Sequence, residues 1–302
     1  MAEQKKAFTF LDPKTVTRIS NMELRARRVV EGFLSGLHKS PFKGFSVEFA
    51  DYRQYMNGDD IGLIDWKVFA RSDKYYVKEF EEETNLKCFF ALDVSGSMGF
   101  KSKKEFLSKQ EYSYYLVSAL AYLMIRQRDS VGLVCFDDKI RTYLPAKVRV
   151  THLRRLFLAM EKTKLGKDTN LGKPIHETAE LLKRRGLVVV VTDLWGDIDE
   201  FLTGIKHFAY DGHEVIVFHL LDPAELTFPY EEMSRFVDLE NGKEVMLDPR
   251  IFREKYIKKV NEHLNYAKIE LAKVGVDYKV LTTETPVDEA LFSYLARRRK
   301  LM

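Results

Sequence analysis

From residue 86 onward the chain alternates short apolar runs with long amphipathic stretches, and this alternation constrains the fold more than any other feature. Apolar runs of strand length stand at 86–93, 130–136, 139–145, 187–193, 214–220 and 277–283. Helical periodicity marks the stretches near 103–128, 149–162, 172–185, 198–208, 250–274 and 286–298. Continuous apolar runs are typical of strands buried on both faces, and strands that alternate with helices form parallel sheets. We therefore predict an α/β fold with an open, mostly parallel sheet and helices on both faces.

The end of this sheet is the first place to look for a functional site. In a doubly wound sheet with strand order 3-2-1-4-5-6, the first and fourth strands are neighbours, and ligands bind beyond their carboxyl ends. Here the first strand ends at Asp93 and the fourth at Asp193. The sequence therefore predicts that these two acids share one crevice.

Turns and a separate N-terminal segment complete the predicted architecture. Asp137 and Asp138 are expected to form a solvent-exposed turn between the second and third strands, and a hairpin is predicted over 237–247. Helical periodicity over 12–37 and short alternating runs over 44–83 predict a helix followed by strands and irregular loops. We predict two parts, listed by residue number: an N-terminal helix and β/loop segment over 1–83 and the α/β domain over 84–302.

Composition and charge exclude several classes of protein. Hydrophobic residues make up 45% of the 302 residues, which is enough for a full core. The net charge is only +4, too small an excess for a dedicated nucleic-acid-binding protein. The start of the chain lacks the apolar region of a signal peptide, and the longest apolar stretch falls short of the about 20 residues that cross a bilayer. We expect a cytoplasmic protein without membrane insertion, in which Cys88 and Cys135 are buried thiols.

The stretch DVSGSM places an acid and two hydroxyls where the first predicted strand ends. Asp93, Ser95 and Ser97 stand at alternate positions and can converge on one point if the backbone loops after the strand. Thr169, just before a predicted helix, and Asp193 offer two more oxygens. Mg²⁺ and Mn²⁺ prefer such oxygen ligands, so the pattern predicts a divalent-cation site. A simple turn is the alternative, because Asp, Ser and Gly favour turns.

Hydrolases that use this end of a sheet need other residues. An aspartyl-nucleophile phosphatase needs a second acid two residues after the first, where this chain has Ser95. A serine nucleophile elbow needs a glycine two residues before the serine, and no phosphate-binding glycine motif follows the first strand. None of the seven histidines stands in a paired ligand spacing, and His176 and His219 are expected to be structural. Metal-dependent hydrolysis stays open as the least favoured alternative.

The same residues resemble the metal-ion-dependent adhesion site of von Willebrand factor A domains, over residues 84–285. The resemblance is carried by DVSGSM, by Thr169 and by the Thr-Asp pair at 192–193. It implies that Mg²⁺ or Mn²⁺ contacts the three hydroxyls and that the carboxylates act directly or through water. The implied residues are Ser95, Ser97, Thr169, Asp93 and Asp193. The resemblance also implies that an Asp or Glu of a partner protein fills the remaining position on the metal.

The preceding stretch, RQYMNGDDIGLIDWKVFAR, resembles the signature R-x-Y-x-x-G-D-D-x-x-x-I-D-W-x-x-x-A-R of the bacterial and archaeal proteins grouped as domain of unknown function 58. The matching residues are Arg53, Tyr55, Gly58, Asp59, Asp60, Ile64, Asp65, Trp66, Ala70 and Arg71. Many members have an arginine where this chain has Gly62. The family has no established catalysis, and the resemblance implies a MoxR-type AAA+ ATPase as partner in assembly or chaperone-like work.

Two interpretations of this signature segment stay open. Its arginines and aspartates can form buried ion pairs with Trp66 as a core anchor, or the segment can be a partner surface. Trp195 is expected to pack beside the crevice, with contact to a bound peptide as the alternative. The sequence thus predicts a metal-dependent protein-interaction module, not an enzyme. The main alternative is a structural scaffold that uses residues 53–71 and needs no metal.

Overall fold

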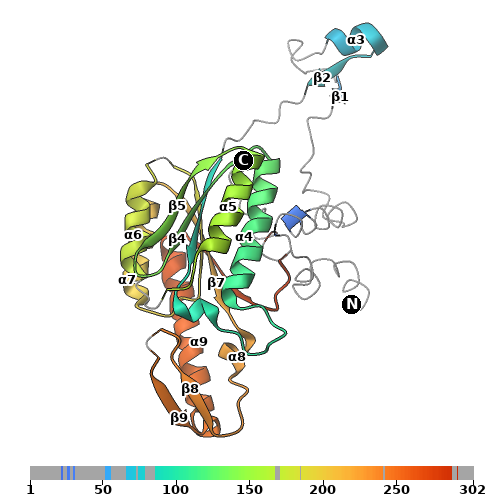
Figure 1. The fold of residues 1–302 in the computed structure, drawn as a ribbon. Helices are drawn as coiled ribbons and strands as arrows, with labels where there is room; N and C mark the ends of the chain where they lie inside the picture. The colour runs from blue at the N-terminus through green and yellow to red at the C-terminus, as the bar shows by residue number, and fades with distance from the viewer. Residues whose placement is uncertain are drawn as a thin grey trace.

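The computed structural model describes nearly all of the chain between residues 86 and 287 and short pieces outside it. The described residues are 22, 26–27, 30, 52–55, 66–72, 74–78, 86–166, 171–183, 185–240, 242–287 and 291. Six of the described strands form one sheet, in the order β10-β7-β6-β3-β4-β5 (Figure 1).

This central sheet confirms the predicted strand order. Its strands are β3 (Lys87–Asp93), β4 (Ser130–Phe136), β5 (Ile140–Lys147), β6 (Leu187–Thr192), β7 (Glu214–Leu221) and β10 (Asp277–Thr282). All neighbouring pairs are parallel except β4 with β5, which is antiparallel. The first and fourth of these strands, β3 and β6, lie side by side, so their carboxyl ends meet as predicted.

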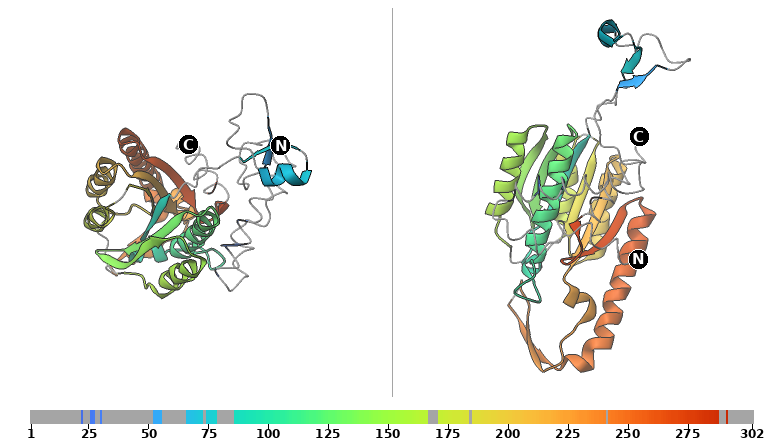
Figure 2. Two further views of the ribbon diagram at one scale, coloured as in Figure 1. Left: turned by 90° about the horizontal axis from the view of Figure 1, so that it is seen from above. Right: turned by 90° about the vertical axis from the view of Figure 1, so that its right-hand side faces the viewer.

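Helices cover both faces of the sheet (Figure 2). One face packs against α4 (Lys109–Arg126) and α5 (Val150–Lys162). The other packs against α6 (Gly172–Leu181), α7 (Ile198–Tyr210) and α9 (Pro249–Lys273). Every residue of β4 and β6 is buried, because side chains on both sides of these strands meet a layer of helices. The predicted α/β fold class is confirmed.

Helix α4 begins six residues later than the sequence pattern indicated, at Lys109 instead of 103. A capping box sets this start: the Glu111 backbone N–H donates to the Ser108 hydroxyl, and the Ser108 N–H donates to the Glu111 carboxylate. The first helical residue is therefore Lys109, which lies at the end of the sheet where β3 stops.

The remaining described elements are short. They are β1 (Tyr52–Gln54), α3 (Trp66–Ser72), β2 (Tyr76–Lys78), the 3-10 helix η4 (Gly96–Gly99), α8 (Pro223–Thr227), β8 (Ser234–Val237) and β9 (Glu244–Leu247). β8 and β9 form the hairpin predicted over 237–247. β1 and β2 pair antiparallel, which confirms strands within the predicted β/loop segment.

Part of the predicted N-terminal helix is also present. Residues 22, 26–27 and 30 are helical, and Ala26 and Val30 are fully buried in the core that contains α4. The N-terminal segment thus contributes side chains to the core of the α/β domain. The boundary between residues 83 and 84 stays a prediction.

Some predicted roles of single residues are confirmed and others are wrong. Cys88 and Cys135 are buried free thiols, and buried His219 hydrogen-bonds the Tyr278 hydroxyl, as a structural histidine should. His176 lies on an exposed helix face instead of an apolar one, with its Nδ1 3.2 Å from the Nδ1 of His207. In the described part of the chain, no helix combines the length and apolarity needed to span a membrane.

Candidate metal site

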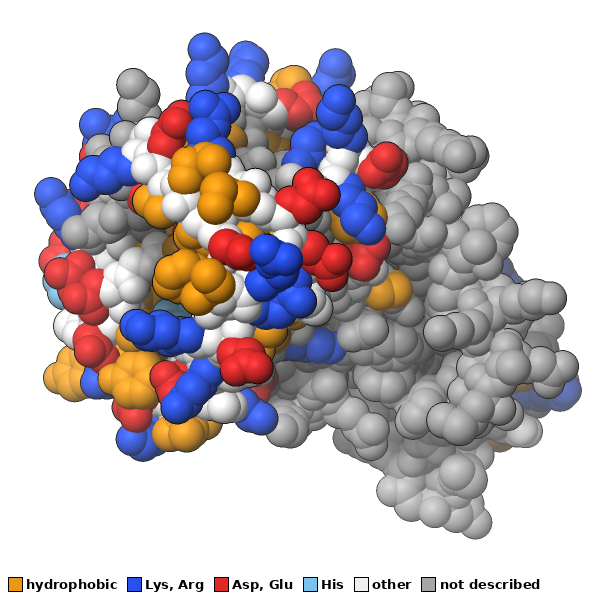
Figure 3. Space-filling view, turned by 90° about the horizontal axis from the view of Figure 1, so that it is seen from below, with side chains coloured by type: hydrophobic (Ala, Val, Ile, Leu, Met, Phe, Trp, Pro, Cys, Tyr) orange, Lys and Arg blue, Asp and Glu red, His pale blue; other side chains and the backbone are white. Residues whose placement is uncertain are grey.

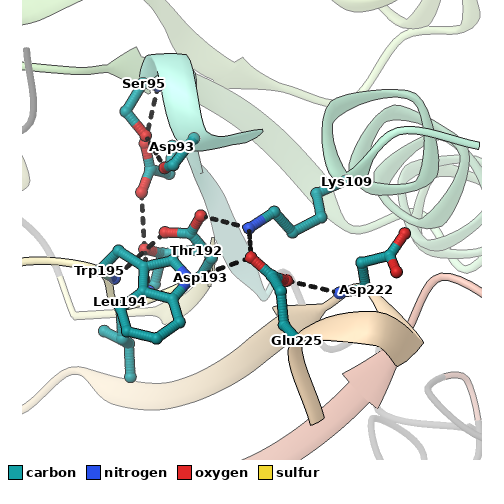
Figure 4. Close-up of polar contacts among 10 residues, drawn as sticks. Asp93, Ser95, Lys109, Thr192, Asp193, Leu194, Trp195, Asp222 and Glu225 are labelled. Carbon is teal, nitrogen blue, oxygen red and sulfur yellow. Dashed lines mark hydrogen bonds and ion pairs between the residues drawn. The ribbon is translucent and has the colours of Figure 1, made fainter. Parts of the chain in front are cut away.

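Asp93 is fully buried at the end of β3 and is held by two hydrogen bonds (Figure 4). The Ser95 backbone N–H donates to its Oδ1 at 2.9 Å, and the Thr192 hydroxyl donates to its Oδ2 at 2.7 Å. Because Thr192 ends β6, the second bond joins the ends of the two central strands. No described lysine, arginine or histidine forms an ion pair with Asp93.

The environment of Asp93 disfavours the ionised form of its carboxyl group. Burial, and after it the negative charge of Asp193, raises the pKa of Asp93 to about 7, against the lowering effect of its hydrogen bonds. A buried carboxylate in this position is stabilised when a cation binds beside it.

Two hydroxyls converge next to Asp93. The Oγ atoms of Ser95 and Ser97 lie 3.0 Å apart and form a hydrogen bond in which either hydroxyl can be the donor. In an octahedral Mg²⁺ site with bonds of about 2.1 Å, adjacent ligand oxygens are separated by about 3 Å. Ser95 is buried, whereas Ser97 is partly exposed, so the pair can be reached from one side. These two residues therefore fit two neighbouring positions around a small divalent cation.

The other two predicted ligands differ from this pair. Thr169 lies outside the described residues. Asp193 directly follows β6 and is nearly fully buried, but its Oδ2 accepts a hydrogen bond from the Lys109 ammonium at 2.7 Å. Its Oδ1 accepts a bond from the Trp195 backbone N–H at 3.2 Å. Asp193 therefore has a cation of its own, which leaves it better suited to a metal contact through water than to direct binding.

Lys109 is the centre of a buried ion-pair network that the sequence did not predict (Figure 4). Its side chain has no exposed surface, and its Nζ lies 2.7 Å from Asp193 Oδ2 and 2.6 Å from Glu225 Oε1. Burial lowers the pKa of Lys109, but the charges of Asp193 and Glu225 raise it by more, so the ammonium stays charged. The Trp195 indole N–H also donates to Glu225 Oε1, at 3.1 Å.

Asp222 connects the ion-pair network of Lys109 to the loop after β3 through hydrogen bonds. It caps α8, where its Oδ1 accepts a hydrogen bond from the Ala224 N–H, and its Oδ2 accepts one from the Ser102 N–H at 3.0 Å. Its own N–H donates to Glu225 Oε2 at 2.7 Å. Backbone donors thus satisfy Asp222, and the loops that follow β3 and β7 are held together beside the candidate site.

A pocket of about 660 Å³ lies between the β4–β5 turn, β5 and the end of α5. It is lined by Asp137, Asp138, Arg141, Thr142, Ala159, Lys162, Thr163, Lys164, Leu165 and Gly166. The prediction that Asp137 and Asp138 form a solvent-exposed turn is wrong for Asp137, which is 1% exposed. The Arg141 Nε donates to both carboxylate oxygens of Asp137, at 2.7 and 2.6 Å, which compensates for the burial.

The aromatic residues singled out in the sequence fall into two environments. Trp195 stacks on His263 with ring centroids 6.0 Å apart and binds Glu225, which confirms a packing role beside the crevice. Trp66 is not a core anchor, because 55% of it is exposed and its described ring contact is an edge contact with Phe69.

The rest of the signature segment is described only in part. Arg53 lies on β1, and Tyr55 packs against Tyr75 with ring centroids 6.4 Å apart. Ala70 and Arg71 are exposed on α3. The remaining members, Gly58, Asp59, Asp60, Ile64 and Asp65, lie outside the described residues, and so does Gly62. The ion-pair interpretation, without Trp66 as its core anchor, and the partner-surface interpretation therefore stay predictions.

Sequence reasoning missed Lys109 and Glu225, and it gave Thr192 no role of its own. A signal for Lys109 was present: the S-x-x-E pattern at residues 108–111 marks the start of a helix directly after the first strand. Glu225 follows an Asp-Pro pair that opens a helix after the fifth strand. Within the described residues, no group of three or more His, Cys, Asp or Glu can hold a metal, so a cation here depends on hydroxyl ligands.

Comparison with solved structures finds proteins of similar architecture. The crystal structure of the conserved hypothetical protein BatB from Bacteroides thetaiotaomicron matches with a TM-score of 0.49 at 20% identity, over 70% of this chain and 99% of that chain. The SpRpn10 VWA domain matches with a TM-score of 0.42 at 11% identity, over 69% of this chain and 94% of that chain.

Sequence comparison identifies the family. The uncharacterized proteins Rv1480 of Mycobacterium tuberculosis (strain H37Rv) and Mb1516 of Mycobacterium bovis are each 24% identical over 294 residues, which cover 96% of this chain and 91% of each relative. The model of the family described as protein of unknown function DUF58 matches residues 51–266, which is more than half of the chain. The chain therefore belongs to the DUF58 family.

Proposed function

We propose that this protein is a divalent-metal-dependent protein-interaction module and not an enzyme. Ser95, Ser97 and Thr169 would bind Mg²⁺ or Mn²⁺ directly, and Asp93 and Asp193 would bind it through water. The cation would supply a positively charged docking point for a carboxylate of a partner protein. The observation that carries this proposal is the pair of hydroxyls 3.0 Å apart beside a buried carboxylate.

The charge balance of the site supports a divalent cation. Asp93, Asp193 and Glu225 are carboxylates with little or no exposed surface, and Lys109 is the described ammonium that pairs with two of them. These four groups, when ionised, carry two net negative charges. Buried charges need compensation, and a divalent cation beside Asp93 would provide it.

The same contacts favour binding over catalysis. A hydrolase needs a general base within hydrogen-bond reach of the attacking water. Asp93 is fully buried, and both of its carboxylate oxygens already accept hydrogen bonds. Asp193 and Glu225 are both bound to the Lys109 ammonium, and burial lowers the pKa of His219 to about 3. These contacts make a binding site the better description of this crevice.

The surface next to the site fits an acidic partner. Residues 137–164, which include β5 and α5, contain eight Lys and Arg against three Asp and Glu, whereas the whole chain has a net charge of only +4. Arg141, Lys162 and Lys164 line the pocket described above. The Gly166 N–H at the pocket edge donates to the Val94 carbonyl at 2.7 Å, so the pocket adjoins the loop that carries the hydroxyls. We infer a cytoplasmic partner with an acidic segment, and a MoxR-type AAA+ ATPase is the candidate that the family resemblance implies.

Calorimetric titration of the metal-free full chain with Mg²⁺ and Mn²⁺ tests the proposal. The Asp93→Asn variant, which keeps the shape of the side chain, should bind metal about 10–100-fold more weakly. Asp211→Asn, at the C-terminal end of α7, is the matched control and should bind like the native chain. Circular dichroism verifies that each variant is folded.

The titration is repeated in sodium acetate, whose carboxylate can take the position of the partner's side chain. Absence of binding in both buffers, or equal affinity in the Asp93→Asn variant, contradicts the proposal. The second candidate is then a metal-independent scaffold. The Lys109 ammonium favours that candidate, because it already gives Asp193 a cation. Partner capture by a scaffold would be unaffected by a chelator.

A further inference from the structure

The β8–β9 hairpin reaches back to the loop that carries the two serines. In Figure 1 the hairpin lies below the sheet, at the end where β3 stops. A Cβ atom added to Gly96 would lie 2.9 Å from the Leu239 carbonyl oxygen and 3.3 Å from Glu240 Cγ. It would also lie 3.2 Å from the Gly166 carbonyl oxygen. Glycine is therefore required at position 96, because the hairpin connection closes over it.

This contact brings a carboxylate close to the proposed metal ligands. Gly96 stands between Ser95 and Ser97, and the Glu240 carboxyl group is one carbon beyond the atom that approaches Gly96. The Glu240 side chain thus lies next to the loop segment that carries the two serine hydroxyls.

The hairpin connection holds Glu240 in a defined place. The Glu240 N–H donates to Asp238 Oδ1 at 2.8 Å, and the Gly242 N–H donates to the Asp238 carbonyl at 2.9 Å. Gly242 has a φ of +71°, which this turn requires and which glycine adopts without strain. Local hydrogen bonds therefore order the residues around Glu240 and fix where its side chain starts.

The base of the hairpin is anchored to the domain by aromatic packing. Phe236 of β8 stacks on Phe228 with ring centroids 5.5 Å apart, and Phe228 stacks on Tyr256 of α9 at 4.5 Å. The rest of the hairpin is open to solvent, with Val245 and Met246 more than half exposed. Figure 3 shows this end of the molecule, where hydrophobic side chains stand among charged ones. Aromatic packing thus holds the base of the hairpin, and the connection between β8 and β9 lies against Gly96.

We propose that Glu240 is an internal carboxylate ligand of the cation bound by Ser95 and Ser97, and that a partner binds by replacing it. This inference rests on the proposed metal-dependent function. Mg²⁺ and Mn²⁺ accept carboxylate oxygens readily, and an internal ligand needs no association of two molecules. Glu240 would therefore raise the affinity for metal and lower the affinity for an external carboxylate by the fraction of time that it occupies the site.

Two other acids of the same hairpin serve for comparison. Asp238 accepts the Glu240 N–H in the turn, and Glu244 lies 3.4 Å from Arg235 on the paired strand. Glu244 is exposed, so it provides a matched control with the same side chain in the same hairpin.

The test compares Glu240→Gln with Glu244→Gln in the full chain. Mn²⁺ affinity is measured by calorimetry, and binding of a poly-glutamate peptide is measured in saturating Mn²⁺. Glu240→Gln should bind Mn²⁺ about tenfold more weakly and the peptide more tightly, because a neutral amide is a poorer ligand and a weaker competitor. Glu244→Gln should match the native chain in both measurements.

Glu240→Asp separates a ligand from a nearby charge. It keeps the charge but shortens the side chain by one carbon, so a ligand role predicts that it behaves like Glu240→Gln, whereas a purely electrostatic role predicts native behaviour. If native protein binds Mn²⁺ in an Asp93-dependent way and Glu240→Gln equals Glu244→Gln, this inference is overturned and the proposed function stands. If native protein binds no Mn²⁺ in either buffer, both fail.

Discussion

The carboxyl ends of β3 and β6 each carry a buried aspartate, but the two aspartates have different partners. Asp193, after β6, has the ammonium of Lys109 at 2.7 Å. Asp93, at the end of β3, accepts hydrogen bonds from the Ser95 backbone N–H and the Thr192 hydroxyl but has no basic partner among the described residues. Both side chains are nearly or fully buried, so burial alone does not distinguish them.

One half of the site thus has a basic partner within the chain, and the other half has none among the described residues, so the proposed function assigns it a bound divalent cation. The Asp193 half contains its own counter-charge and holds loops together through Lys109, Glu225 and Asp222. The Asp93 half combines a carboxylate of raised pKa with two hydroxyls in the spacing of metal ligands. Variants that remove one partner at a time test this difference between Asp93 and Asp193.

The largest effect is expected for Lys109→Met. The change leaves Asp193 and Glu225 buried without their cation, which should lower the free energy of unfolding by about 3–5 kcal/mol. Urea denaturation measures this loss. Lys173→Met is the control, because Lys173 is exposed and lies 4.0 Å from Glu177, and it should cost less than about 1 kcal/mol. Equal losses in the two variants would show that the ion pairs of Lys109 are not structurally important.

The second largest effect is expected in the pH dependence of the stability of the metal-free protein. The pKa of Asp93 is raised from 3.8 to about 7, so between these values the folded state holds a proton that the unfolded state has released. Stability should therefore fall as pH rises from about 4 to about 7, by up to about 4 kcal/mol at 1.4 kcal/mol per pKa unit.

The matched variant is Asp93→Asn, which cannot titrate and should show a flatter pH profile. Thermal or urea unfolding across this pH range measures the difference between the two proteins. Saturating Mn²⁺ should reduce the loss in the native chain, because a cation beside Asp93 favours the carboxylate. Identical profiles for the native chain and the variant would contradict a raised pKa of Asp93 in the folded state.

The fold was largely predictable because it depends on patterns that persist along the chain. The valine-rich run at β6 indicates a strand buried on both faces, and the order of strands and helices then restricts the topology. The juxtaposition of Asp93 with the end of β6 followed from that topology alone. Local propensities also placed the β8–β9 hairpin, through the turn that contains Gly242.

The partners of the buried charges could not be predicted in the same way. Lys109 and Glu225 meet through loops whose paths the strand pattern does not specify, and a lysine in a helical sequence normally faces solvent. The same reason explains the error at Asp137, whose two carboxylate oxygens share the Arg141 Nε–H. Hydrophobic periodicity reports which residues meet the core, whereas ion pairs depend on the geometry of tertiary contacts.

The smallest expected effect tests the bond that joins the two halves of the site. Thr192→Val keeps the shape of the side chain but removes the hydroxyl that donates to Asp93 Oδ2 and accepts from the Leu194 N–H at 3.1 Å. Leaving two buried polar groups without this partner should cost about 1–3 kcal/mol of unfolding free energy. Thr203→Val is the control, since its hydroxyl bonds the Asp199 carbonyl on an exposed face of α7.

If Thr192 positions Asp93, its variant should also bind Mn²⁺ more weakly than the Thr203 variant. A loss of stability with native Mn²⁺ affinity would instead limit Thr192 to joining β3 and β6.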